Sequence, residues 1–194
     1  MNRISKLFIL GISSLIVMGF TNYILKQELV PITLKPAKID LTDVKFEIPS
    51  VLLEINQTDL FLDAIGYYES SNRYDIVNRF GYMGKYQFGK ATLRGLGYEV
   101  SRKEFLNSPE IQEQAMLDLL SHNKKILQTY IDYWDGKKIN GKVITESGIL
   151  AAAHLGGPSN VKKFFREGKV FKDGNGTKIT RYLTLFSGYN LNLE

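Results

Sequence analysis

Apolar residues recur at helical spacing in this chain from residue 58 onward, and this pattern constrains the fold more than any other feature. Thr58 is a residue type that favours helix N-caps. After it, Phe61, Ala64, Ile65 and Tyr68 follow the order i, i+3, i+4, i+7. The spacing predicts an amphipathic helix with one buried face.

Two later segments carry clear helix boundaries. Ser108-Pro109-Glu110 combines a cap residue, a proline suited to the first helical position and an early acid, so it predicts the start of a helix. Its apolar positions continue to Ile131, which makes this helix long. Thr145 begins another predicted helix, and the pair Gly156-Gly157 ends it.

Two shorter helices are expected at 159–167 and 177–186, separated by a turn at 173–176 (Asp-Gly-Asn-Gly). The segment 74–88 is aromatic and interrupted by glycines, which indicates a loop or a small hairpin packed against the helices. The fold class predicted from these patterns is mainly α, with at most a small hairpin.

The first 25 residues are typical of an export signal. Arg3 and Lys6 precede a stretch without charge at 7–20, which continues weakly to Leu25. A cleaved signal peptide and an uncleaved hydrophobic helix that anchors the chain in a membrane both fit. Either interpretation predicts an exported chain in the periplasm or cell envelope. The uncleaved helix would anchor the chain in the inner membrane. Residues 26–57 hold three of the five prolines and are interpreted as an extended tether, so the folded domain is expected at 58–194.

Composition removes several function classes. The chain has no cysteine and only two histidines, so thiolate chemistry and histidine metal cages are not expected, and neither is a cofactor. Its net charge is +5, and the basic residues are scattered rather than gathered in a stripe with a recognition motif. We therefore expect no nucleic-acid partner. The chemistry of this chain must depend mainly on carboxylates, hydroxyls and amides.

Glu69 interrupts the apolar face of the first predicted helix. It lies four residues after Ile65 and eight after Phe61, on the same face. Burial raises the pKa of a carboxyl group, and a raised pKa suits a general acid at neutral pH. A glutamate at a helix end that points to solvent explains the same spacing, and periodicity alone favours this second interpretation.

Four sequence segments, which follow one another along the chain, indicate a role for Glu69. They are Glu69-Ser70-Ser71-Asn72-Arg73-Tyr74, Gly84-Lys85-Tyr86-Gln87-Phe88, the segment 151–158 (AAAHLGGP) and Thr180-Arg181-Tyr182-Leu183. Together they resemble the lytic transglycosylase family of the lysozyme-like superfamily, over about 61–189. In that family a Glu-Ser pair ends a helix, a Gly-Leu-Met-Gln segment follows, and an Ala-Ala-Tyr-Asn-Ala-Gly-Pro segment and a late Tyr come after it.

The resemblance implies a lysozyme-like helical domain that cleaves peptidoglycan glycan strands between N-acetylmuramic acid and N-acetylglucosamine. Glu69 is then the catalytic acid and afterwards the base, and a 1,6-anhydro ring forms on the muramic acid without water. The implied partners are peptidoglycan and, through the N-terminal segment, a membrane. The implied substrate-binding residues are Ser70, Tyr86, Gln87, His154 and Tyr182.

The chain departs from the family pattern at two places. Lys85-Tyr86 replaces Leu-Met, and we expect Tyr86 to stack on a sugar ring while Lys85 faces outward or meets a peptide-stem carboxylate. His154-Leu155 replaces Tyr-Asn. Two alternatives stay open. A hydrolytic muramidase needs a second carboxylate, for which Asp75 is the nearest candidate, and a peptidoglycan-binding or scaffold protein needs no catalysis.

Overall fold

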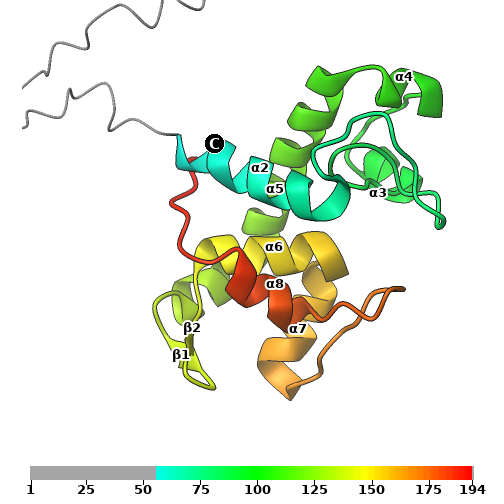
Figure 1. Cartoon of the computed structure of the whole chain (residues 1–194). Helices are drawn as coiled ribbons and strands as arrows, with labels where there is room; N and C mark the ends of the chain where they lie inside the picture. Colours follow the sequence, from blue (N-terminus) through cyan, green and yellow to red (C-terminus); the bar gives the residue numbers. More distant parts are fainter. Residues whose placement is uncertain (1–55, 194) are drawn as a thin grey trace, which may run out of the picture. The chain divides into compact units, whose positions relative to one another are not determined.

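The computed structural model describes residues 56–193, and the predicted signal or anchor and nearly all of the tether lie outside them. The described part is mainly helical, as the sequence predicts, and has one small antiparallel hairpin at 138–143 (Figure 1). Within 56–193, no helix combines the length and apolar character needed to cross a membrane. The elements are α2 (Gln57–Ser70), α3 (Lys90–Gly95), α4 (Arg102–Leu106), α5 (Pro109–Trp134), β1 (Lys138–Ile139), β2 (Lys142–Val143), α6 (Glu146–Gly156), α7 (Pro158–Glu167) and α8 (Ile179–Leu185).

The N-cap of α2 is Asn56 rather than Thr58. The Asn56 side chain accepts a hydrogen bond from the Thr58 amide at 3.0 Å. The Thr58 hydroxyl instead accepts from the backbone amide of Asn192 at 2.9 Å and ties the C-terminal segment to α2. Asn and Thr both serve as N-caps, so the local pattern did not decide between them.

Helix α6 lies at the centre of the domain. Seven of its residues, Ser147–Ala153, are buried, and it packs against α5, α7 and α8. Figure 1 shows α6 between α5 and α8. Small residues allow this close packing: a Cβ on Gly148 would lie 2.3 Å from the backbone oxygen of Leu183 in α8. Thr145 is the N-cap, as predicted, and Gly157 is the C-cap.

The other boundaries also follow the sequence signals closely. Pro109 stands in the first turn of α5, and α5 runs for 26 residues. The turn at 173–176 is present, where Asp173 Oδ1 accepts from the amides of Asn175 (3.0 Å) and Thr177 (2.6 Å). The segment 74–88 is not helical and is held by isolated bridges that join Val77, Met83 and Phe88.

Candidate active-site cleft

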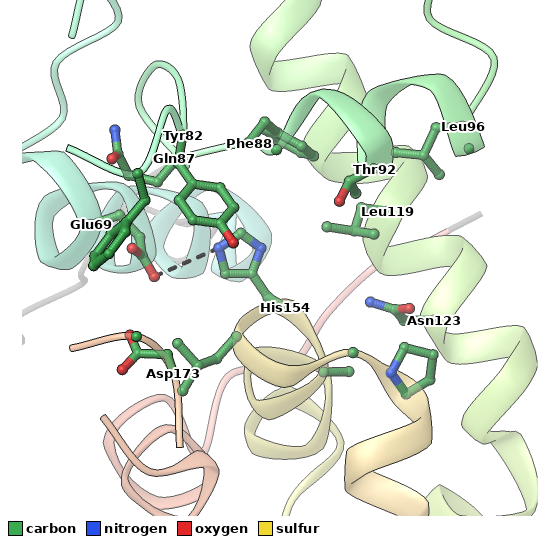
Figure 2. Close-up of a pocket in the computed structure, with 18 of the residues that line it drawn as sticks. Glu69, Tyr82, Gln87, Phe88, Thr92, Leu96, Leu119, Asn123, His154 and Asp173 are labelled. Atoms are coloured by element: carbon green, nitrogen blue, oxygen red, sulfur yellow. Dashed lines mark ion pairs between the residues drawn. The ribbon is translucent and has the colours of Figure 1, made fainter. Parts of the chain in front are cut away.

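A cleft of about 720 Å³ lies among the parts of the domain that the sequence motifs mark. One side comes from the 78–89 loop and α3, and the other comes from the end of α6, the start of α7 and the 173–175 turn. Leu119 and Asn123 of α5 close the far end (Figure 2), and His122 of α5 also lines the cleft. Glu69, from the last turn of α2, also lines it.

Two side chains from distant parts of the sequence meet the Glu69 carboxylate. Tyr182 in α8 donates a hydrogen bond from its hydroxyl to Glu69 Oε1 at 2.5 Å. His154 Nε2, in α6, lies 3.6 Å from the same oxygen, the ion pair marked in Figure 2. The side chains of Glu69 and His154 are only 17% and 8% exposed, so water screens this pair weakly. Glu69 is therefore a paired carboxylate in a cleft, not a helix-end residue that points to solvent.

The pKa of Glu69 is lowered, opposite to the direction expected from the sequence. Burial raises the pKa of this carboxyl, as predicted. The close contact and charge of His154, together with the hydrogen bond from Tyr182, outweigh burial and hold the pKa of Glu69 below its ordinary value. The prediction of a raised pKa was wrong because it considered the face of one helix and not the partners that α6 and α8 bring to it. Burial, and then the neighbouring Glu69, also raise the pKa of Tyr182.

Gln87 lines the cleft, and its backbone is unusual. Its φ is +52°, in the left-handed region that non-glycine residues seldom adopt. The side-chain Nε2 donates to the carbonyl of Gly84 at 2.8 Å, which fixes the amide. Strained backbone of this kind is found preferentially at functional sites. The structure thus brings Glu69, Gln87, His154 and Tyr182 together around one end of the cleft.

Ser70 does not line the cleft. Its hydroxyl donates to the carbonyl of Lys85 at 2.8 Å and accepts from the amide of Arg73 at 2.9 Å. The side chain is buried and its hydrogen bonds join the segment after α2 to the 84–88 segment. The prediction that Ser70 contacts a sugar is therefore wrong. Its role is structural: its hydrogen bonds fix the position of the end of α2, which carries Glu69, relative to the segment that carries Gln87.

Tyr86 and Lys85 point into the protein, so both expectations for them are corrected. Tyr86 is fully buried, and its hydroxyl donates to Glu113 Oε2 at 2.5 Å, so its ring is not free to stack on a sugar. Lys85 Nζ lies 2.9 Å from both Asp63 and Glu113. Burial lowers the pKa of Lys85, but these two carboxylates outweigh burial and raise the pKa to about 12. Glu113 of α5 is the acceptor that turns this segment inward.

The second carboxylate of the cleft is Asp173 and not Asp75. Asp75 has a side chain that is 73% exposed, pairs with Arg73 and does not line the cleft. Asp173 lines the cleft at the same end as Glu69 (Figure 2). The Asp-Gly-Asn-Gly pattern predicts the turn at 173–176 correctly, but a turn can also carry a side chain into a site.

Two loops meet beside this end of the cleft. Arg79 donates to the side-chain oxygen of Asn175 at 2.9 Å, across 96 residues of sequence. The ring of Phe80 comes within 3.3 Å of the position that a Cβ on Gly174 would take. Phe80, Gly174 and Asn175 all line the cleft, so these contacts border it directly.

Comparisons with known proteins found no matching family model, no matching curated protein and no matching solved structure. Within residues 56–193, no group of three or more histidine, aspartate or glutamate side chains is arranged to hold a metal ion.

Proposed function

We propose that this chain is a peptidoglycan lytic transglycosylase with a lysozyme-like helical domain. The observation that carries the proposal is the convergence of Tyr182 and His154 on Glu69 inside a cleft that Gln87 also lines. Each residue comes from a different one of the four segments on which the family resemblance rests. We further propose that the N-terminal segment exports the chain and holds it in the cell envelope, where glycan strands are its substrate.

In the proposed reaction Glu69 acts twice. Its protonated form gives the proton to the glycosidic oxygen while the bond from the muramic acid C1 to that oxygen breaks. The resulting carboxylate then takes the proton of the C6 hydroxyl, whose oxygen bonds to C1 and closes the 1,6-anhydro ring. One carboxylate is sufficient, whereas ordinary glycosidases use two.

His154 and Tyr182 prepare Glu69 for both steps. In the free protein they favour the carboxylate, as the lowered pKa of Glu69 shows. A sugar that fills the cleft removes water from Glu69, and this added desolvation favours the protonated acid. His154 Nε2 lies 3.6 Å from Glu69 Oε1 and contacts the carboxylate from the α6 side. Tyr182 fixes the orientation of the carboxyl group through its hydrogen bond.

The test is mass spectrometry of the soluble muropeptides that the full-length chain releases from purified peptidoglycan. We expect products lighter by one water than reducing-end muropeptides. Glu69→Gln should abolish them, because the amide neither donates nor accepts the required proton. Asp75→Asn is the matched control: it also neutralises an acid close in sequence, but that acid lies outside the cleft, so activity should be retained.

A second candidate function is hydrolysis, and the position of Asp173 in the cleft favours it over the other alternative. A hydrolytic muramidase requires a second carboxylate to position water or stabilise the intermediate. Reducing-end products would establish this reaction, and their loss in Asp173→Asn would assign the second carboxylate. If the chain sediments with peptidoglycan and releases nothing, it is a binding protein and both enzymatic proposals fail.

A further inference from the structure

Aromatic side chains from α5 and α7 gather on a surface outside the cleft. The ring of Trp134 stacks on that of Phe165, with the centroids 5.2 Å apart and an interplanar angle of 18°. The ring centroids of Tyr130 and Phe164 lie 6.0 Å and 5.3 Å from that of Phe165. The centroid of Tyr133 lies 5.1 Å from that of Trp134. None of these five residues, here called the aromatic patch, lines the cleft.

The aromatic patch is only partly buried. Tyr133 is 58% exposed, and the other four residues pack against the core while part of each stays in contact with solvent. Tyrosine and tryptophan join an apolar ring to a polar group, and they are enriched where one side of a surface is apolar and the other is wet. The patch therefore offers apolar area to a partner outside the domain.

The two segments that form the aromatic patch are rich in basic residues. Lys137 Nζ lies 3.3 Å from the ring centroid of Tyr133, and Lys162 Nζ lies 6.0 Å from that of Tyr130. The segment 158–170, which contains α7, has four basic residues and one acidic residue, and the segment 130–139 has two of each. The two segments together hold six basic residues against three acidic ones, so this surface is complementary to a partner with negative charge.

We propose that the aromatic patch and the basic residues of these two segments bind the surface of an anionic lipid bilayer. Tyrosine and tryptophan rings lie at the level of the lipid headgroups, and lysine and arginine side chains reach the phosphate groups beside them. A hydrated anionic polymer would pair with the cations but leave the rings in water, so the combination favours a bilayer.

A membrane contact of this kind is weak by itself. Stable attachment requires two signals, and the proposed N-terminal anchor supplies the other, because it keeps the domain at a high local concentration beside the membrane. The two together would hold the domain against the bilayer. This inference goes beyond the proposed function and does not depend on the proposed reaction.

The test uses the fluorescence of Trp134, the only tryptophan in the chain, which reports directly on the aromatic patch. The full-length chain is mixed with vesicles of phosphatidylcholine, and with vesicles in which phosphatidylglycerol replaces part of that lipid. Both kinds contain the same fraction of phosphatidylcholine with brominated acyl chains, which quench a tryptophan that contacts lipid. The N-terminal segment meets the same hydrocarbon core in both, so its insertion alone gives no difference between them. We expect quenching of Trp134 in the anionic vesicles only.

Two double variants test the role of charge. Lys163→Gln with Arg166→Gln removes two exposed cations of α7. It should lower the ratio of lipid-bound to free Trp134 about 30-fold, since each basic residue near an anionic membrane contributes about fivefold. Arg94→Gln with Arg102→Gln is the matched control, because it removes two exposed cations from α3 and α4, at the opposite end of the domain from α7 (Figure 1). This control should leave the quenching unchanged, and thermal melts verify that both variants fold.

Several results would overturn the proposal. They are equal quenching in the two kinds of vesicle, no quenching in either, and an equal loss of quenching in the two double variants. A change of Trp134 emission with soluble polyglutamate as large as the change with anionic vesicles would also overturn it, and would indicate an anionic polymer as the partner. Tyr133→Ser tests the rings: it removes an exposed ring and should weaken the quenching in anionic vesicles.

Failure of this inference can be distinguished from failure of the proposed function. Release of muropeptides from purified peptidoglycan needs no lipid, so Lys163→Gln with Arg166→Gln should leave it unchanged. Anhydro products without quenching of Trp134 would leave the function standing and remove the membrane surface. Quenching that depends on anionic lipid, with no cleavage of peptidoglycan, would leave a membrane-binding domain without the proposed activity.

Discussion

The charge pair between His154 and Glu69 leads to a prediction about stability that needs no substrate. Replacing His154 with Phe keeps a ring against Phe88, whose centroid lies 6.3 Å from that of the histidine. The replacement removes the group that most lowers the pKa of Glu69, while burial, which raises this pKa, stays. Glu69 should therefore change from a carboxyl with a lowered pKa to one with a raised pKa.

The size of the effect follows from the geometry. A protonated His154 and an ionised Glu69, 3.6 Å apart, attract each other by about 4–5 kcal/mol at an effective dielectric constant of about 20. The loss on mutation is smaller, because Glu69 can take up a proton instead of staying charged. At pH 6, protonating a carboxyl with the ordinary pKa of 4.5 costs about 2 kcal/mol. We expect His154→Phe to lower the free energy of unfolding by about 2 kcal/mol at pH 6, or about 8 °C in Tm.

The lowered pKa of Glu69 determines how the effect of His154→Phe on stability changes with pH. A carboxyl group with a folded-state pKa below its unfolded value stabilises the protein above the unfolded pKa, and this contribution is lost as pH falls through the folded value. The difference between the two chains should therefore shrink when thermal melts are repeated near pH 3. His122→Phe is the control, because this exposed histidine forms no ion pair among the described residues. If His154→Phe lowers the stability equally at pH 6 and near pH 3, or does not lower it at pH 6, the explanation by a charge pair is refuted.

Two further predictions concern packing and a buried ion pair. Gly148→Ala should destabilise the domain by about 2 kcal/mol in urea unfolding, since the new methyl would meet the Leu183 carbonyl, whereas Gly95→Ala, with open space around it, should be neutral or slightly stabilising. Lys85→Met should lower the free energy of unfolding by about 1–2 kcal/mol at pH 7, because it removes the buried cation between Glu113 and Asp63, and water screens the 67% exposed Asp63 side chain. The pKa of Lys85 is raised from 10.5 to about 12, so the stabilisation by this ion pair is present below pH 10.5 and should disappear as pH rises through 12. A difference in stability between the two chains that persists above pH 12 would contradict the ion-pair explanation.

The larger helices were predictable because their boundaries are encoded locally. Pro109 begins α5, and Thr145 and Gly157 cap α6. The short helices α3 and α4, of six and five residues, and the hairpin at 138–143 were not predicted. Each of these helices buries only one residue, so neither shows an apolar period. Segments this short are stabilised by tertiary packing and not by their own sequence pattern.

The site was predictable in its members more than in their orientations. Four residues that the motifs single out, Glu69, Gln87, His154 and Tyr182, lie around one end of the cleft. No spacing reveals that Glu113, 27 residues after Tyr86, accepts a hydrogen bond from that tyrosine and holds it inward. The sequence pattern also marks Asn123, another residue that lines the cleft. It lies four residues after Leu119 and four before Leu127 on the buried face of α5, the same interruption of an apolar stripe that singled out Glu69.

The contact between Arg79 and Asn175, with Phe80 against Gly174, joins two loops that border the cleft. Among the described residues, no backbone hydrogen bond joins these two loops; only side chains span them. Exposed side chains change rotamer within picoseconds to nanoseconds, far faster than loops or domains rearrange. The proposed glycan substrate would therefore need only the Arg79 and Phe80 side chains to turn away, and no rearrangement of the backbone, to pass between these two loops.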